Sequence, residues 1–110
     1  NTYKQKIMEA TIAGINVKVN EEGYLTDFSQ WNEDIAKEIS VQEEIGELTD
    51  RHWTVIKYLQ DQFKKEVPLT IRKVGKSGVT DIKEFYALFP GGPLKKATKI
   101  AGIPKPVGCI

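Results

Sequence analysis

The run from Thr49 to Pro68 is the feature that most restricts how this chain can fold. Its large apolar residues share a spacing of three or four: Trp53, Ile56, Leu59 and Phe63. That spacing is typical of one face of an α-helix. Thr49 is a favourable N-cap residue, and Pro68 ends the helix because it restricts Val67 and has no N–H. A helix with one apolar face must bury it, so the rest of the chain has to supply a core.

Shorter elements are predicted on both sides of this helix. Residues 10–28 favour a small β-hairpin or three-stranded meander, with turn signals around Gly14 and at 20–23. A helix is predicted from near Ser29 to near Glu44, with an apolar stripe of Trp31, Ile35 and Ile39. Trp31 and Trp53 are both predicted to lie in the core. Short helices are predicted over 69–74, from Thr80 or Asp81 to Phe89, and over 94–101, the second with an apolar face of Ile82, Phe85, Tyr86 and Phe89.

The two ends of the chain differ from its middle. Residues 1–9 show no clear period and are expected to be loosely held. Residues 103–110 hold two prolines within three residues, which favours an extended, mobile arm. The predicted fold class is therefore α+β: a mainly helical single domain over 1–110, with an N-terminal hairpin, a helix-turn-helix-like segment and a C-terminal arm.

Length and composition exclude several classes of protein. The 110 residues fit one domain. No stretch approaches the roughly 18 apolar residues of a membrane span, and no signal-peptide pattern is present. A single cysteine excludes an internal disulfide and indicates a reducing compartment, so we expect the cytoplasm. One cysteine and one histidine cannot supply the usual four ligands of a structural zinc site.

The charge is unevenly distributed along the chain. Residues 1–68 carry 8 basic and 13 acidic side chains, whereas residues 69–110 carry 8 basic and 2 acidic ones. A basic C-terminal third suits an acidic partner, an anion or nucleic acid. It is equally compatible with solubility and attraction to the acidic part of the same fold.

Cys109, next to last in the chain, is the first candidate for chemistry. Chain ends are usually exposed, and a thiolate that reacts with a partner must be reachable. The alternative is an inert cysteine packed into a groove. His52 lies one position from the apolar stripe, and we expect a partly exposed helix residue there rather than a catalytic base.

A helix-turn-helix-like arrangement gives a second candidate function. The predicted helices at 69–74 and 80–89 are joined by a glycine-containing turn and carry basic residues: Arg72, Lys73, Lys76 and Lys83. This pattern suggests DNA binding. The second helix, however, offers few side chains for reading base edges, and Asp81 and Glu84 would repel phosphates.

Two C-terminal motifs resemble the DsrC/TusE family, which includes the gamma subunit of dissimilatory sulfite reductase. They are LFPGGP at 88–93 and KIAGIPKPVGCI at 99–110. Upstream support comes from EGYL at 22–25, Trp31, and LTxxHWxxIxYL from Leu48 to Leu59. The resemblance covers about residues 10–110. It implies a mainly helical α+β fold, no prosthetic group, and a mobile arm whose penultimate cysteine, here Cys109, accepts sulfur as a persulfide.

The resemblance also implies partners and one departure. A sulfur carrier of this family acts as a co-substrate rather than an enzyme by itself, between sulfur donors and acceptors such as sulfurtransferases, tRNA-thiolation enzymes or siroheme sulfite reductase. Lys99, Lys105, Arg72 and Lys73 are the residues expected to form a basic docking surface. Members that work with sulfite reductase carry a second cysteine eleven residues before the last, where this chain has Thr98. A two-thiol cycle within this chain is therefore in doubt, and a single-thiol relay is expected.

Overall fold

Helix α2, Asp50–Lys64, is the longest helix in the computed structural model, which describes residues 6–107. It begins directly after Thr49, as predicted. It ends four residues before Pro68, because the backbone turns at Lys65 and reaches a positive φ of 58° at Glu66. Local backbone geometry, rather than the proline, therefore ends the helix.

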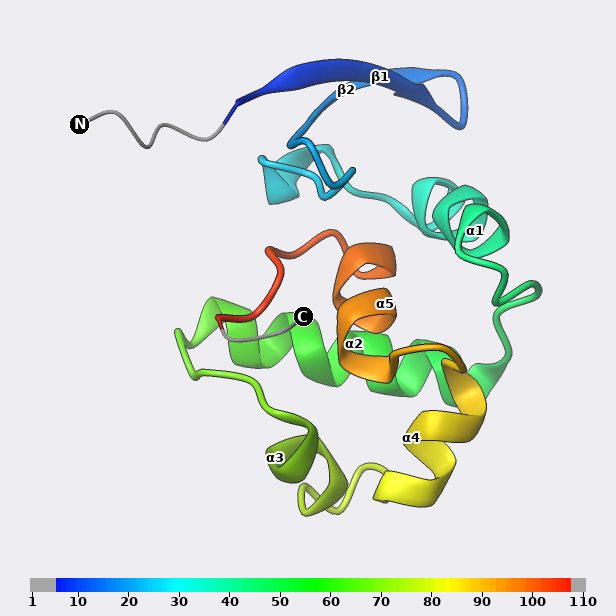
Figure 1. The fold of residues 1–110 in the computed structure, drawn as a ribbon, viewed down its shortest axis with the longest axis vertical. Coiled ribbons are helices and arrows are strands. Elements are labelled where there is room, and N and C mark those ends of the chain that lie inside the picture. The colour runs from blue at the N-terminus through cyan, green and yellow to red at the C-terminus, as the bar shows by residue number, and fades with distance from the viewer. Residues whose placement is uncertain (1–5, 108–110) are drawn as a thin grey trace.

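A two-stranded hairpin and four further α-helices complete the described part of the chain (Figure 1). In order, they are β1 (Met8–Ile12), β2 (Ile15–Val19), the short 3-10 helix η1 (Phe28–Gln30), α1 (Glu33–Gln42), α3 (Ile71–Gly75), α4 (Ile82–Leu88) and α5 (Pro93–Ile100). The α+β class and the N-terminal hairpin are confirmed. Helix α5 lies in the middle of the molecule, between α1 and α2. Within residues 6–107, none of the helices combines the length and the apolar character needed to cross a bilayer.

The hairpin is shorter than the predicted meander and begins earlier. Strands β1 and β2 are antiparallel, with Met8 opposite Val19 and Ile12 opposite Ile15. The turn between them uses positive φ at Ala13 and Gly14, as two-residue hairpin turns require. The predicted return strand at Tyr24 and Leu25 is reduced to one bridge between Val19 and Leu25.

Helix α1 starts later than the predicted position near Ser29. The Asn32 side chain accepts a hydrogen bond from the Ile35 N–H at 2.8 Å and caps the helix. Asp27 caps η1 in the same way, accepting from the Ser29 N–H. Trp31 therefore precedes α1, although its spacing to Ile35 resembles a helix repeat. The prediction of one helix from Ser29 was wrong because two capping side chains divide the segment.

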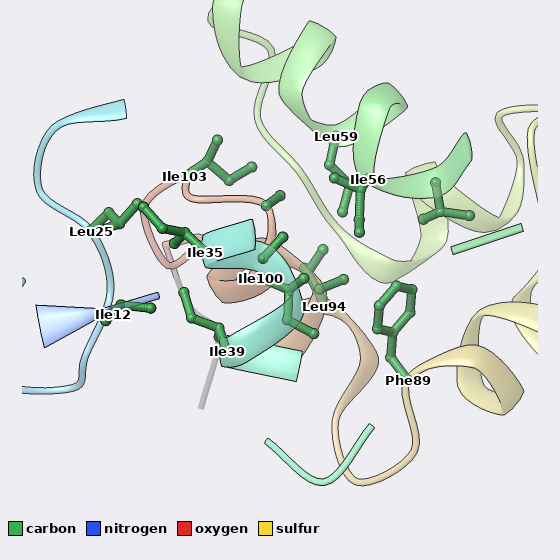
Figure 2. Close-up of a cluster of buried hydrophobic side chains, with 14 of the residues drawn as sticks. Ile12, Leu25, Ile35, Ile39, Ile56, Leu59, Phe89, Leu94, Ile100 and Ile103 are labelled. Carbon is green, nitrogen blue, oxygen red and sulfur yellow. The ribbon is translucent and has the colours of Figure 1, made fainter. Parts of the chain in front are cut away.

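The core lies where α1, α2 and α5 meet, with the hairpin residue Ile12 at one side of it (Figure 2). Its labelled members come from each of these elements and from the segments between them: Ile12, Leu25, Ile35, Ile39, Ile56, Leu59, Phe89, Leu94, Ile100 and Ile103. Trp31 and Trp53 pack against this cluster while remaining partly exposed. Ile103, the first residue of the predicted arm, is buried in the core.

The predicted apolar face of α4 is only half correct. Phe85 and Phe89 are fully buried, but Ile82 and Tyr86 are 46% and 48% exposed. Helix α4 spans seven residues and contacts the rest of the protein mainly through α3 and α5, so only the 85/89 pair faces the core.

Candidate functional site

Cys109, the predicted sulfur-carrying residue, lies outside the described residues. The site that the structure does describe is the attachment of the C-terminal segment, residues 101–107, to the body of the protein. Cys109 is the second residue after this segment in sequence, so the attachment sets the point on the fold to which the cysteine is tethered.

Helix α5 ends in a Schellman motif, a hydrogen-bonded helix terminus that needs a left-handed residue. The Gly102 N–H donates to the Lys99 carbonyl and the Ile103 N–H donates to the Thr98 carbonyl, both at 3.1 Å. Gly102 has a φ of 75°, which glycine adopts without strain. The glycine predicted to close this helix is confirmed. The motif turns the chain so that Ile103 enters the core.

Two side chains from other elements bind the carbonyl oxygens at the end of α5. The Trp31 Nε1–H donates to the Ile100 carbonyl, and the Gln60 Nε2 donates to the Ala101 carbonyl, each at 2.9 Å. Such terminal carbonyls have no partner within their own helix. The Trp31 ring also packs on Gly102 so closely that a Cβ there would lie 2.4 Å from Trp31 Cδ1. The segment is thus fixed at its origin.

Beyond this origin, one ion pair holds the segment. Lys105 Nζ lies 2.9 Å from Glu22 Oε2. The pKa of the Glu22 carboxyl is lowered, chiefly by its hydrogen bond with Lys105. Two residues further on, the Val107 side chain is fully exposed. The described chain therefore passes from the paired Lys105 and a partly buried Pro106 to an exposed side chain at Val107.

The turn at 20–24 supplies this ion pair and also contacts α5. Asn20 Oδ1 accepts hydrogen bonds from the N–H groups of Glu22 and Tyr24, both at 3.0 Å. Gly23 lets the Lys99 side chain approach, because a Cβ at Gly23 would lie 3.0 Å from Lys99 Cε. The Tyr24 hydroxyl donates to the Lys95 carbonyl at 2.8 Å. Residues 22–25, the EGYL motif, therefore contact both α5 and the segment that follows it.

The four predicted basic residues fall into two groups. Lys99 and Lys105 are paired within the chain, Lys99 Nζ with Glu43 at 2.9 Å and Lys105 with Glu22. Arg72 and Lys73 are exposed on α3. They form no ion pair with any residue of 6–107, and neither do Lys76 and Lys83 nearby.

Thr98 is fully buried, and its hydroxyl donates to the Leu94 carbonyl at 2.7 Å. The side chain thus faces the interior of the fold. Thr98 stands at the position of the second cysteine discussed above, and its hydroxyl cannot perform thiol chemistry.

His52 differs from its predicted role as a partly exposed residue. It is 8% exposed, and both ring nitrogens are used. Nδ1 accepts from the Thr49 N–H at 3.0 Å, and Nε2 lies 2.8 Å from the Leu88 carbonyl, so the proton is assigned to Nε2. His52 joins the start of α2 to the end of α4. With no free nitrogen it is a structural residue.

The α3–α4 segment is held to α2 by an ion pair. Arg51 Nε and Nη2 donate to the Glu84 carboxylate at 3.0 and 2.6 Å, and Thr80 donates to the same carboxylate. These contacts lower the pKa of Glu84 to about 2, the Arg51 hydrogen bond being the largest cause. Two short helices joined by a turn are present, as the sequence predicted.

Sequence reasoning missed several contacts of this site. Gln60, four residues after Ile56, carried a detectable signal, because that spacing places a polar side chain on the buried face of α2. Lys96 Nζ donates to the Glu43 carbonyl at 2.8 Å. The Glu22–Lys105 pair joins residues too far apart in sequence for any local pattern to reveal it.

Comparison with known proteins places these features in a family. The family model described as DsrC like protein matches residues 11–110. The gamma subunit of dissimilatory-type sulfite reductase from Nitratidesulfovibrio vulgaris is 37% identical over 93% of this chain and 98% of its own. A sulfurtransferase TusE homolog from Haemophilus influenzae is 40% identical over 90% and 97%.

Solved structures agree with the sequence matches. The NMR structure of Allochromatium vinosum DsrC has a TM-score of 0.81 and 31% identity, covering 96% of this chain and all of that one. The oxidized gamma subunit (DsrC) from Archaeoglobus fulgidus has a TM-score of 0.76 and 34% identity, covering 94% of this chain and all of that one. The resemblance found in the sequence is confirmed over nearly the whole chain, and the protein belongs to the DsrC-like family.

Proposed function

We propose that this protein is a sulfur carrier that accepts sulfur as a persulfide on Cys109 and hands it to a partner. The observation that carries this proposal is the attachment of residues 101–107: the segment is fixed at Gly102 and Ile103, is held by the ion pair of Lys105, and reaches an exposed side chain at Val107. The chain's one cysteine is the second residue after this segment. Relatives named as a TusE homolog and as a sulfite reductase gamma subunit support the same role.

The chemistry requires one thiol and no net oxidation or reduction. The Cys109 thiolate attacks the outer sulfur of a donor persulfide, R–S–SH. A new S–S bond forms on Cys109, the donor's S–S bond breaks, and R–S⁻ leaves with the electron pair. An acceptor thiolate then attacks the outer sulfur of Cys109–S–SH in the same way. This cycle needs no second cysteine, which agrees with the presence of Thr98. We place it in the cytoplasm, where a free thiol persists.

We assign partner docking to the basic surface of α3 and α4. Arg72 and Lys73 are exposed and lack acidic partners among the described residues, so they are available for an acidic partner protein. Lys99 and Lys105 already contact Glu43 and Glu22. They would join this surface only where a partner's carboxylate replaces their own.

Mass spectrometry tests the carrier function directly. After incubation with glutathione persulfide and removal of the donor, the intact protein should gain the mass of one sulfur atom. Reduction with dithiothreitol should remove it. The Cys109→Ser variant should gain nothing, and a Thr98→Ser variant should behave like the wild type. An unchanged mass of the wild-type protein would exclude the carrier function.

A second candidate is an accessory role at a siroheme sulfite reductase, which the name of one relative favours. In that role the C-terminal segment would enter the reductase. Purified siroheme reductase should then retain the wild-type chain on a size-exclusion column and lose it when residues 106–110 are deleted. Thr98 argues against a complete two-thiol cycle in this complex.

A further inference from the structure

We infer that Glu22 is a positioning residue for Cys109: its ion pair with Lys105 sets the point from which the carrier segment extends, and an acidic partner releases the segment by taking Lys105. The inference rests on the proposed carrier function. It concerns how the cysteine is presented, not whether it reacts.

The segment has two attachments of unequal strength. At the first, Ile103 is 1% exposed and its N–H is bonded to Thr98, within a helix end that Trp31 and Gln60 also hold. At the second, the Lys105 and Glu22 side chains remain 24% and 53% exposed. An ion pair this open to water is weak and exchanges readily. The second attachment can therefore open while the first stays closed.

The second attachment is well placed to direct the chain. Glu22 sits in a turn fixed by Asn20, so its carboxylate is presented by a rigid element. Lys105 lies between Pro104 and Pro106, whose rings restrict the backbone. Because the backbone around Lys105 is stiff, a restraint on its side chain also restricts the direction in which the following backbone can run.

Chain geometry shows what release would change. Four residue steps separate Lys105 from Cys109, a contour of at most about 14 Å. Six steps separate Ile103 from Cys109, or about 22 Å. Opening the ion pair therefore lengthens the tether by about half and moves its pivot from Lys105 to Ile103.

The chemistry of the competing group follows from the contact. A group that replaces Glu22 must be an anion near the entrance of the partner's sulfur-transfer site, and an exchange of one carboxylate for another leaves the charge on Lys105 compensated. The partner that this arrangement fits is a protein with an acidic entrance, the same chemistry that the exposed cations of α3 favour.

A spin label on Cys109, the chain's one cysteine, tests the inference without any partner. Paramagnetic broadening of backbone amides in ¹⁵N-labelled protein reports where the label spends its time. In low salt the wild type should broaden a restricted set of amides. Glu22→Gln should spread the broadening over more amides and weaken its maximum at least twofold, as should about 1 M salt, where screening is strong. Glu21→Gln, the matched neighbour, should leave the pattern unchanged, and Glu22→Asp should largely restore it.

Identical broadening in the wild type and Glu22→Gln would overturn the inference. The exchanged pair Glu22→Lys with Lys105→Glu should restore the wild-type pattern, and a failure to do so would also count against it. Sulfur loading from glutathione persulfide should be the same in Glu22→Gln and wild type. If neither protein is loaded with sulfur, the carrier function is rejected. The positioning role of Glu22 is decided separately, by the broadening experiment.

Discussion

The indole Nε1–H of Trp31 donates a hydrogen bond to the carbonyl oxygen of Ile100 at 2.9 Å, joining residues 69 positions apart. This bond ties the segment before α1 to the last turn of α5. The terminal carbonyl is one that the helix itself cannot satisfy. Through this contact the N-terminal half of the chain holds the origin of the C-terminal segment.

Trp31→Phe should destabilise the protein by about 1–3 kcal/mol, because it leaves the Ile100 carbonyl without its donor. Denaturant unfolding followed by circular dichroism measures the change. Trp53→Phe is the matched control: Trp53 also packs against the core while partly exposed, and its indole N–H forms no hydrogen bond within residues 6–107. An equal loss in both variants would show that aromatic area, not the hydrogen bond, matters at Trp31.

Gly102→Ala should lower the free energy of unfolding clearly more than Gly14→Ala does. Both glycines have a φ of 75°, so both variants incur the left-handed backbone cost of about 1 kcal/mol. A Cβ at Gly14 meets nothing within 4 Å, whereas one at Gly102 collides with the Trp31 ring. Overpacking of that kind adds about 1–3 kcal/mol. Equal unfolding free energies for the two variants would contradict the close packing of Trp31 on Gly102.

The ion pair between Arg51 and Glu84 should make stability depend on pH. The pKa of Glu84 is about 2 in the folded protein, below its value of 4.5 as a free side chain. A lowered pKa means that the folded state binds its proton less tightly than the unfolded state. The stabilisation is therefore complete above about pH 4.5 and is lost as the pH falls towards 2.

Unfolding measured between pH 7 and pH 2 checks this expectation. Arg51→Gln should reduce the loss of stability below pH 4.5, because the carboxylate no longer has its strongest partner. Lys57→Gln removes a cation from an exposed position of the same helix and should leave that loss unchanged. Parallel pH profiles for the wild type and Arg51→Gln would rule out this contribution.

Local patterns predicted the elements better than the contacts between them. The stripe and cap of α2 and the glycine after α5 follow from neighbouring residues, as does the cap of α4, which was narrowed to Thr80 or Asp81 and is Asp81. Trp31 was misplaced because its distance of four residues from Ile35 imitates a helix repeat, whereas the Asn32 side chain starts the helix after it.

The attachment of the C-terminal segment could not be derived in the same way. The bond from Trp31 to Ile100, the bond from Gln60 to Ala101, and the pair of Glu22 with Lys105 join distant parts of the chain. No periodicity or capping rule links such positions. The family resemblance marked several of these residues as a set, and the structure supplies the reason: they meet at the end of α5.

A cysteine at position 98 should be protected from reagents in water. Thr98 is fully buried, so the thiol in Thr98→Cys, made together with Cys109→Ser, should react with a water-soluble aromatic disulfide only when the end of α5 opens. Val107→Cys in the same background places the thiol at a fully exposed position and is the control. The buried thiol should react on the order of 100-fold more slowly, which corresponds to a modest free energy of local opening. Comparable rates would mean that the end of α5 opens freely, and the fixed origin of the carrier segment would then have to be abandoned.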